Sequence, residues 1–280
     1  MSLLEAILLG IVQGLTEFLP ISSSGHLILV PWLQDYTYLQ DHESFNKTFD
    51  VALHIGTLAA VVTYFRTDLG RMAHGWVRTF RTRAIETTDE RLAWVVVVAT
   101  IPAVIVGGLG EDWIDRNLGE PWMIAIALIG FGLLLGDADR RPQEKKVSDI
   151  SLRMGLILGV AQSLALSPGT SRSGITMTAA RYMHIDRDGA ARISFLMLVP
   201  VTFGAVVVKA TGAVTDGLPD GSIGPIIVGI IASAISGYLA IAWLLRLLRT
   251  HSYRGFVIYR VLAGLFVLSL IASGVRSATF

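Results

Sequence analysis

Long stretches without a charged residue are the feature that most limits how this chain can fold. Four of them approach the length of a membrane span, at residues 92–110, 121–136, 154–171 and 221–245. Three more, at residues 51–65, 193–208 and 255–275, are shorter or contain a single Arg. A helix needs about 20 apolar residues to cross the hydrocarbon core of a bilayer. With 52% hydrophobic and only 16% charged residues, the chain is predicted to be an all-α polytopic membrane protein.

The N-terminus and the cysteine content narrow the prediction further. The first apolar stretch carries Glu5 and lacks both a basic start and a small-residue cleavage site, so we expect it to stay in the mature protein. The chain contains no cysteine, which excludes disulfides and thiolate metal sites. The net charge of +1 gives no reason to expect a nucleic acid partner.

Lys and Arg collect in alternate loops between the apolar stretches. Seventeen of the 23 basic residues fall at residues 66–91, 140–153, 181–192 and 246–254. The alternate loops, at residues 33–47, 109–120 and 209–222, hold one basic residue each and nine acids: Asp35, Asp41, Glu43, Glu111, Asp112, Asp115, Glu120, Asp216 and Asp220. Because short basic loops stay in the cytoplasm, the first set is predicted to be cytoplasmic and the second external. The Arg-rich loop 66–91 is also expected to contact anionic lipid headgroups.

This topology predicts a re-entrant segment. The loops 140–153 and 181–192 are both assigned to the cytoplasm, so the apolar segment between them must enter and leave by the same face. Residues 151–185 are therefore expected to form a re-entrant helical hairpin. Residues 1–34 could either span the membrane or form a hairpin that opens outward, and the charges alone do not decide between these.

An internal repeat favours the hairpin. Gly10 to Gln13 (GIVQ) resembles Gly159 to Gln162 (GVAQ), and Ser24-Gly25 has the same offset of 149 from Ser173-Gly174. The chain is then a single membrane domain of six spans and two hairpins, with residues 1–136 as the first repeat, 137–149 as a cytoplasmic linker and 150–280 as the second repeat. Because each repeat has an odd number of spans, the second repeat has the opposite orientation in the membrane to the first. This is the inverted-repeat plan of many membrane proteins, which have a polar site near the midplane of the bilayer.

Polar groups interrupt the first predicted hairpin. Residues 13–26 read QGLTEFLPISSSGH and contain an acid, Glu17, and an imidazole, His26, with three hydroxyls and two helix-breaking residues between them. A buried, unpaired carboxylate or imidazole costs several kcal/mol, so such groups persist in membranes mainly where they line a polar cavity with partners. This stretch is therefore the first candidate for a functional site.

The second predicted hairpin breaks at residues 167–174, SPGTSRSG. Pro and Gly end one half-helix and Ser can cap the next. The new helix N-terminus favours an anion, and Arg172 beside it can bind phosphate or carboxylate oxygens in a bidentate way. If the repeat brings this break opposite the first, an acid, an imidazole and hydroxyls meet an anion-binding group, which is what hydrolytic phosphoryl transfer requires.

Other functions remain open at this point. Inverted repeats with paired hairpins are typical of secondary transporters, so a transporter or a polyprenyl-lipid flippase is the main alternative, and both activities could coexist. A channel is less favoured because Glu17, His26 and Arg172 converge on one point. The chain has no Walker loop and no dinucleotide-binding glycine motif, so nothing supports nucleotide use.

The two motifs, QGLTEFLPISSSGH and PGTSRSG, closely resemble those of the BacA/UppP family of undecaprenyl-pyrophosphate phosphatases, and length and hydropathy agree over the whole chain. The resemblance implies a multi-pass enzyme of the bacterial plasma (inner) membrane. It would remove the terminal phosphate from undecaprenyl pyrophosphate, recycle the lipid carrier of cell-wall synthesis and confer resistance to bacitracin, which competes for that substrate. We expect the active site to face the periplasmic side, with the substrate entering sideways from the membrane. The sequence leaves the oligomeric state open, with a homodimer as the assembly to test.

The resemblance also assigns residues. It implies that Glu17 is the essential acid, that His26 is the motif histidine, and that Ser23 is a nucleophile or positions one. The predicted catalytic set is Glu17, Ser23, His26 and Arg172, and the predicted phosphate-binding set is Gln13, Ser22, Ser24, Ser171, Arg172, Ser173 and Thr176. The family depends on a divalent cation, Mg²⁺ or Ca²⁺, for which Glu17 is the predicted ligand. Many members have Glu at the position of Gln13, so a mechanism with two carboxylates is in doubt here.

Some of these residues have plainer interpretations. Ser, Gly and Thr in membrane helices often serve close packing, which applies singly to Ser22, Ser24, Ser173 and Thr176. Glu17 could form a structural ion pair with Arg172. His54 and Asp50, at the external start of a span, favour capping or interfacial roles. Arg260 could extend its charge to the membrane surface or have a structural or substrate-facing role.

Overall fold

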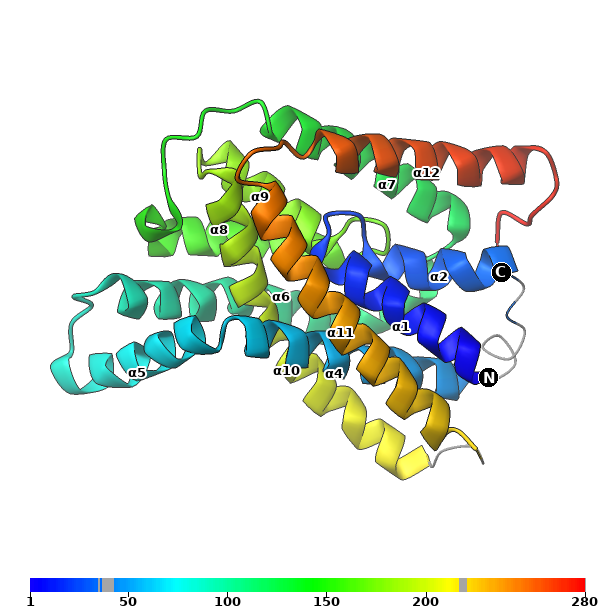
Figure 1. Ribbon diagram of the computed structural model, residues 1–280, viewed down its shortest axis with the longest axis horizontal. Coiled ribbons are helices and arrows are strands. Elements are labelled where there is room, and N and C mark those ends of the chain that lie inside the picture. Colours follow the sequence, from blue (N-terminus) through cyan, green and yellow to red (C-terminus); the bar gives the residue numbers. More distant parts are fainter. Residues whose placement is uncertain (35, 37–42, 217–220, 280) are drawn as a thin grey trace.

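The computed structural model describes residues 1–34, 36, 43–216 and 221–279, without the side chains of residues 43, 44, 111, 112, 115, 116 and 209–216. Its described part is built from helices (Figure 1): α1 (Leu3–Phe18), α2 (Ser23–Gln34), α4 (Glu43–Tyr64), α5 (Arg66–Thr82), α6 (Thr88–Asn117), α7 (Pro121–Ala138), η1 (Val147–Asp149), α8 (Leu152–Ser163), η2 (Leu164–Leu166), α9 (Arg172–Tyr182), α10 (Arg187–Asp216), α11 (Ile223–Leu247) and α12 (Arg254–Ala272).

Helix length separates the spans from the hairpins. Within the described residues, α6, α7, α10, α11 and α12 each contain an apolar segment long enough to cross a membrane. A sixth span is formed by α4 if its bent pairing with α5 counts once. By contrast, α2, α8 and α9 have only 11 or 12 residues each, a rise of about 18 Å or less. The predicted all-α, multi-pass membrane protein is confirmed.

The two short helix pairs point their tips at each other. In Figure 1, α1 and α2 extend from the middle of the molecule toward one end, and α8 extends from the middle toward the other. The chain turns back between Phe18 and Ser23 in the first pair and between Leu166 and Arg172 in the second. Both polar breaks therefore lie near the centre of the fold, as expected of hairpins that open in opposite directions.

Glycines let one helix of each hairpin lie very close to a span. A Cβ atom on Gly14 of α1 would be 2.5 Å from the carbonyl oxygen of Ser233 in α11. A Cβ atom on Gly159 of α8 would be 2.5 Å from the carbonyl oxygen of Ala99 in α6. Such contacts need small residues at the interface. The α1–α11 and α8–α6 pairs correspond to each other if the two halves are related, but the inverted repeat itself stays a prediction.

The Arg-rich segment 66–91 is not simply the loop that the sequence predicted. It contains helix α5, which leaves α4 at an angle of 81° and packs against α6. Trp76 and Phe80 of α5 meet edge to face at 4.9 Å between ring centroids, and the ring centroid of Trp94 in α6 lies 6.0 Å from that of Trp76. The charge pattern placed this segment at a membrane surface but could not show that one face of it is apolar and packed.

The linker between the halves is not simply solvated either. Arg181, at the end of α9, is fully buried and donates hydrogen bonds to the carbonyl oxygens of Asp139, Arg141, Pro142 and Ile185. Arg187 contacts the Asp139 carboxylate at 2.5 Å. Further along, a hydrogen bond from Lys146 to Asp186 raises the pKa of the lysine. Arg181 of α9 and Arg187 of α10 thus anchor the linker, whereas the charge pattern indicated only a topological role for them.

Most of the predicted external acids fall outside the part of the chain whose side chains the structure describes. The side chains of Asp35, Asp41, Glu43, Glu111, Asp112, Asp115, Asp216 and Asp220 lie outside the described residues. Glu120 is described, and it lies directly before α7. The boundaries of the two repeats, at residues 136 and 150, also stay predictions.

Candidate active site

Each hairpin turns back through a serine with an unusual backbone. Ser22 has φ = 79° and Ser171 has φ = 73°, a left-handed conformation that is uncommon for residues with a side chain. Each serine caps the helix that follows it: Ser22 Oγ accepts a hydrogen bond from Gly25 N at 3.3 Å and Ser171 Oγ from Gly174 N at 3.0 Å. The predicted capping is confirmed. The two residues are 149 positions apart, the offset of the sequence repeat.

Hydrogen bonds join the two tips directly. Ser22 Oγ also accepts from Gly169 N at 3.1 Å, and Ser173 Oγ donates to the Leu19 carbonyl at 3.0 Å. Gly169 has φ = 90°, and a Cβ there would lie 2.8 Å from the Ile124 carbonyl oxygen. A residue with a side chain would clash at this point, so glycine is required for the tips to meet.

Arg260, from α12, forms hydrogen bonds to both breaks. Its side chain is fully buried and donates to five carbonyl oxygens, at 3.0 to 3.4 Å: Pro20 in the first break, Gly169 and Thr170 in the second, and Ala127 and Leu128 in α7. These carbonyls lack helix partners or lie in a span, and a buried carbonyl without a donor is costly. Of the roles that the sequence left open for Arg260, the structure supports the structural one.

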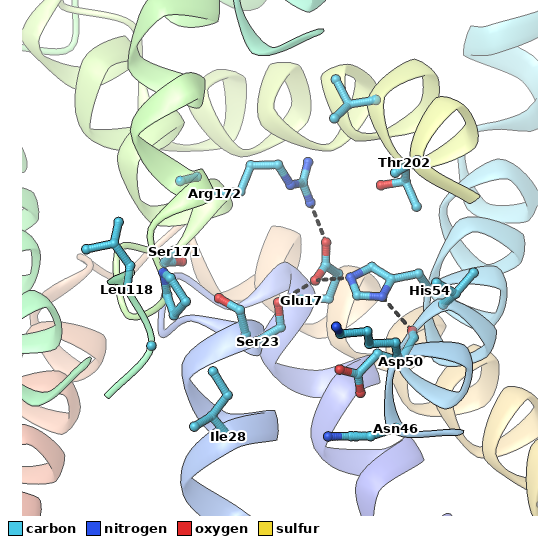
Figure 2. A pocket seen from close by; sticks show the side chains of 18 of the residues that line it. Glu17, Ser23, Ile28, Asn46, Asp50, His54, Leu118, Ser171, Arg172 and Thr202 are labelled. Carbon is cyan, nitrogen blue, oxygen red and sulfur yellow. Dashed lines mark hydrogen bonds and ion pairs between the residues drawn. The ribbon is translucent and has the colours of Figure 1, made fainter. Parts of the chain in front are cut away.

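A cavity of about 840 Å³ opens beside the joined tips. The starts of α2 and α9 line it through Ser23, Ser24, Ser171 and Arg172. α4 contributes Asn46, Asp50 and His54, and α10 contributes Thr202. Glu17 lies among Arg172, Ser23 and His54 (Figure 2). The N-terminal ends of α2 and α9 therefore face the same cavity as Glu17 and His54.

Glu17 is the centre of the polar contacts. Its Oε1 accepts from Arg172 Nη2 at 2.8 Å, and its Oε2 accepts from Ser23 Oγ at 2.5 Å and from Gln13 Nε2 at 3.2 Å. His54 Nε2 lies 3.9 Å from Oε2 (Figure 2). Only 6% of Glu17 is exposed. A buried carboxylate is stable here because several donors and a cation surround it.

The predicted phosphate-binding residues divide into two groups. Arg172, Ser171 and Ser24 line the cavity. Gln13, Ser22, Ser173 and Thr176 are at most 1% exposed. Thr176 Oγ1 donates within the protein, to Ser194 Oγ at 2.7 Å or to the Arg172 carbonyl at the same distance. In this arrangement the buried group supports the tips, and the first group faces the space where a ligand would bind.

His26 lies behind the tip and is not among the cavity-lining residues. Its Nδ1 is 2.7 Å from the Ser22 carbonyl, and its Nε2 is 2.6 Å from the hydroxyl of Tyr259 in α12. Both ring nitrogens are therefore engaged, and the ring fixes the Ser22 turn. The acid–base role predicted for His26 stays a prediction, because a proton could reach a ligand only after the Tyr259 contact breaks.

His54 is the imidazole that faces the cavity, and sequence reasoning gave it too little weight. Its Nδ1 donates to the Asp50 carbonyl at 2.7 Å, which leaves Nε2 directed at Glu17 (Figure 2). A signal was present in the sequence. Asn46, Asp50 and His54 are spaced by four, so they form one polar face at the start of an otherwise apolar helix.

The donor set suits a hard cation only when a ligand supplies part of the coordination. Within the described part of the chain, no three acids or histidines lie close enough together to hold a metal ion. Both oxygens of Glu17 already accept hydrogen bonds. Mg²⁺, however, commonly uses one or two carboxylates together with substrate phosphate oxygens. Glu17, the cavity hydroxyls and a diphosphate would together provide such a set.

Comparisons with known proteins identify the family of this chain. The family model described as bacitracin resistance protein BacA matches residues 6–266. The chain is 43% identical over 277 residues to the undecaprenyl-diphosphatase of Pelobacter propionicus, covering 98% of this chain and 99% of that protein. It is 45% identical over 266 residues to the undecaprenyl-diphosphatase of Geobacter sulfurreducens, covering 94% and 96%. With a family match over nearly its whole length, this chain belongs to the bacitracin resistance protein BacA family.

Proposed function

We propose that this protein hydrolyses undecaprenyl diphosphate to undecaprenyl phosphate and inorganic phosphate. The observation that carries the proposal is the cluster of Arg172, Glu17 and Ser23 in an open cavity, formed where two hairpin tips meet within a membrane protein. The names of its relatives support the substrate. A lipid diphosphate fits such a site because its headgroup can enter the cavity while its chain stays in the membrane.

Substrate binding is assigned to the second hairpin. Arg172 offers a planar pair of donors that suits phosphate oxygens. It is the first residue of α9, so the positive end of that helix also faces the cavity. Ser171 and Ser24 add hydroxyls on either side. In the absence of substrate, Glu17 balances the charge of Arg172.

Bond cleavage is assigned to Ser23 with Glu17 as its base. A nucleophile and a base within hydrogen-bond reach, with the base oriented by a third group, are the signature of covalent catalysis. Ser23 Oγ attacks the terminal phosphorus and Glu17 takes the hydroxyl proton. The bond from that phosphorus to the bridging oxygen breaks, and undecaprenyl phosphate leaves. Water then cleaves the phosphoserine and releases phosphate. The alternative, in which Ser23 positions an attacking water, gives no phosphoserine.

The leaving phosphate needs a proton, and His54 is the cavity-lining imidazole that can supply it. The hydrogen bond from its Nδ1 to the Asp50 carbonyl fixes the ring, and Nε2 can then carry the proton. His26 holds the turn that presents Ser23. A divalent cation, Mg²⁺ or Ca²⁺, would be held by Glu17 together with the diphosphate and would neutralise charge on the phosphate oxygens.

The location and the partners follow from the same proposal. We assign the protein to the bacterial plasma (inner) membrane, with the cavity facing the periplasm, because the predicted basic loops lie on the opposite side. Bacitracin, which binds the substrate, would compete with the enzyme for it. A homodimer is also proposed, to be tested by mass measurement of the protein in detergent. A flippase or transporter is less favoured, because relatives of nearly full length carry the name of a phosphatase.

The deciding experiment is release of inorganic phosphate from undecaprenyl diphosphate by the purified protein in detergent, with and without a chelator. We expect release that stops with the chelator and returns with Mg²⁺ or Ca²⁺. Detergent removes any sealed compartment, so a transporter would bind the lipid and release no phosphate. No release under any of these conditions would end the phosphatase proposal, and release that is unaffected by the chelator would remove the cation from it.

A further inference from the structure

A second depression, of about 320 Å³, lies between α4, α5, α6 and α10. Its lining is hydrophobic throughout and carries no charged residue, which contrasts with the polar cavity described above. α4 contributes Leu58 and Val62, α6 contributes Val97, and α10 contributes Val199 and Phe203. We call this depression the apolar groove.

The groove continues the line of the cavity along two packed helices. On α4, His54 lines the cavity, and Leu58 and Val62 line the groove, at intervals of four residues that keep one helix face. On α10, Thr202 lines the cavity, and Val199, three residues earlier, lines the groove. Because α4 and α10 pack against each other, the groove starts about one helical turn from the site of phosphate chemistry.

One side of the groove is open and its far end is closed. Phe203 is 60% exposed and Val62 40% exposed, on the surface where a span of this kind meets lipid. At the far end α5 crosses, after its 81° bend from α4, and places Met72, Ala73 and Trp76 against the groove. A hydrocarbon chain that leaves the cavity in this direction would therefore lie between α4 and α10, pack on α6 and end against α5.

We propose that the apolar groove binds the first isoprene units of the substrate's polyprenyl chain, while the diphosphate occupies the cavity. This rests on the proposed function. The chain is covalently joined to the diphosphate, so it must leave the cavity along a surface that carries no charge. Within a membrane the gain is not transfer from water, because lipid is as apolar as the groove. The gain comes from close packing, which a diphosphate does not obtain if its chain is too short to enter the groove.

The test compares chain lengths in matched variants. Val97→Trp and Ala73→Trp fill the groove from two different helices. Val98→Trp and Val77→Trp place the same side chain on the same helices outside it, since neither residue lines the groove. For each variant, purified in detergent, KM and kcat are measured with undecaprenyl diphosphate, and the inhibition constant Ki against it with dimethylallyl diphosphate, whose single isoprene unit is too short to follow the groove. None of the four positions belongs to the cavity.

We expect the two filling variants to raise KM for undecaprenyl diphosphate about five-fold or more, which corresponds to about 1 kcal/mol of lost binding. Ki for dimethylallyl diphosphate should rise much less, and both control variants should behave like the unmodified protein. An equal rise for both diphosphates, or none for the long one, would overturn the proposal. So would an ordinary phospholipid as occupant, seen as crosslinking to Val97 from a photoreactive acyl chain that undecaprenyl diphosphate does not displace.

The controls separate this inference from the function itself. If the unmodified protein releases no phosphate from undecaprenyl diphosphate, the proposed function fails and the groove assignment fails with it. If the protein hydrolyses undecaprenyl diphosphate and the filling variants keep the unmodified KM for it, only the groove assignment fails.

Discussion

Arg172 donates a hydrogen bond to Glu17 at 2.8 Å, although the two residues are 155 positions apart in the chain. Each comes from a different hairpin, and both are largely buried, with exposures of 14% and 6%. The pair is surrounded by groups that a simple structural ion pair would not need: the Ser23 hydroxyl at 2.5 Å from Glu17, the His54 imidazole at 3.9 Å, and an open cavity. The contact therefore joins substrate binding to the proposed base.

Replacing Arg172 separates charge from geometry. Arg172→Lys keeps a cation but loses the two-pronged donor, so we expect KM to rise about ten-fold or more with a smaller fall in kcat. Arg172→Ala also leaves Glu17 without its cation and should lower kcat/KM by about 10³-fold. Steady-state kinetics with undecaprenyl diphosphate measure both. Equal kinetics for Arg172→Lys and the unmodified enzyme would mean that bidentate contact is not used.

Ser23 and Ser24 form a matched pair for testing the nucleophile. Both line the cavity, but a hydrogen bond to Glu17 is described for Ser23. Ser23→Ala should lower kcat about 10²–10⁴-fold, and Ser24→Ala should reduce it less than about ten-fold. Rapid acid quenching of the unmodified enzyme followed by mass spectrometry should find phosphate on Ser23. If Ser23→Ala is inactive and no phosphoserine forms, Ser23 positions a water instead.

The two imidazoles should respond differently to substitution. His54→Gln removes the cavity-lining acid, and we expect kcat to fall about 10²-fold while the thermal unfolding temperature stays close to that of the unmodified protein. His26→Gln breaks the contacts to Ser22 and Tyr259 and should lower activity and thermal stability together. Steady-state kinetics and thermal unfolding in detergent separate the two results. A stable His26→Gln protein with a lower kcat, beside a His54→Gln protein of normal kcat, would return the acid–base role to His26.

Arg260 should matter for folding more than for chemistry. Arg260→Met removes this donor from five carbonyl oxygens. Those of Pro20, Gly169 and Thr170 lie outside the helices, and each buried unsatisfied group costs about 1–3 kcal/mol. We expect a large fall in the thermal unfolding temperature in detergent. Arg254→Met, at the exposed start of the same helix, is the control and should change it little. A stable but inactive Arg260→Met protein would instead indicate contact with substrate.

Cation binding should depend on the diphosphate. Because both Glu17 oxygens are engaged by Arg172 and Ser23, Mg²⁺ alone should bind weakly in isothermal titration. A non-hydrolysable diphosphate should tighten it about ten-fold or more, and Mg²⁺ should tighten the diphosphate by the same factor, since coupling between ligands is reciprocal. Glu17→Gln should abolish the coupling. Tight binding of Mg²⁺ without diphosphate would point to a preformed site elsewhere.

The sequence by itself determined the class of protein and the residues at the two breaks. Uncharged stretches such as residues 92–110 can be buried in lipid only as helices, because the backbone has no other partner there. Charged and helix-breaking residues at positions 13–26 and 167–174 could persist in such a chain only with polar partners. The position of Glu17 and Arg172 in one site was therefore predictable from their chemistry and from the repeat.

The tertiary structure decided which neighbours these residues have. A one-dimensional pattern does not show that the ring nitrogens of His26 contact Ser22 and Tyr259 while His54, from a different helix, faces the cavity. Nor does it show that Arg260 supports both tips, because its five partners are backbone atoms, which carry no sequence signal. Contacts of this kind depend on the angles at which helices cross, and those are set by close packing of small residues over the whole chain.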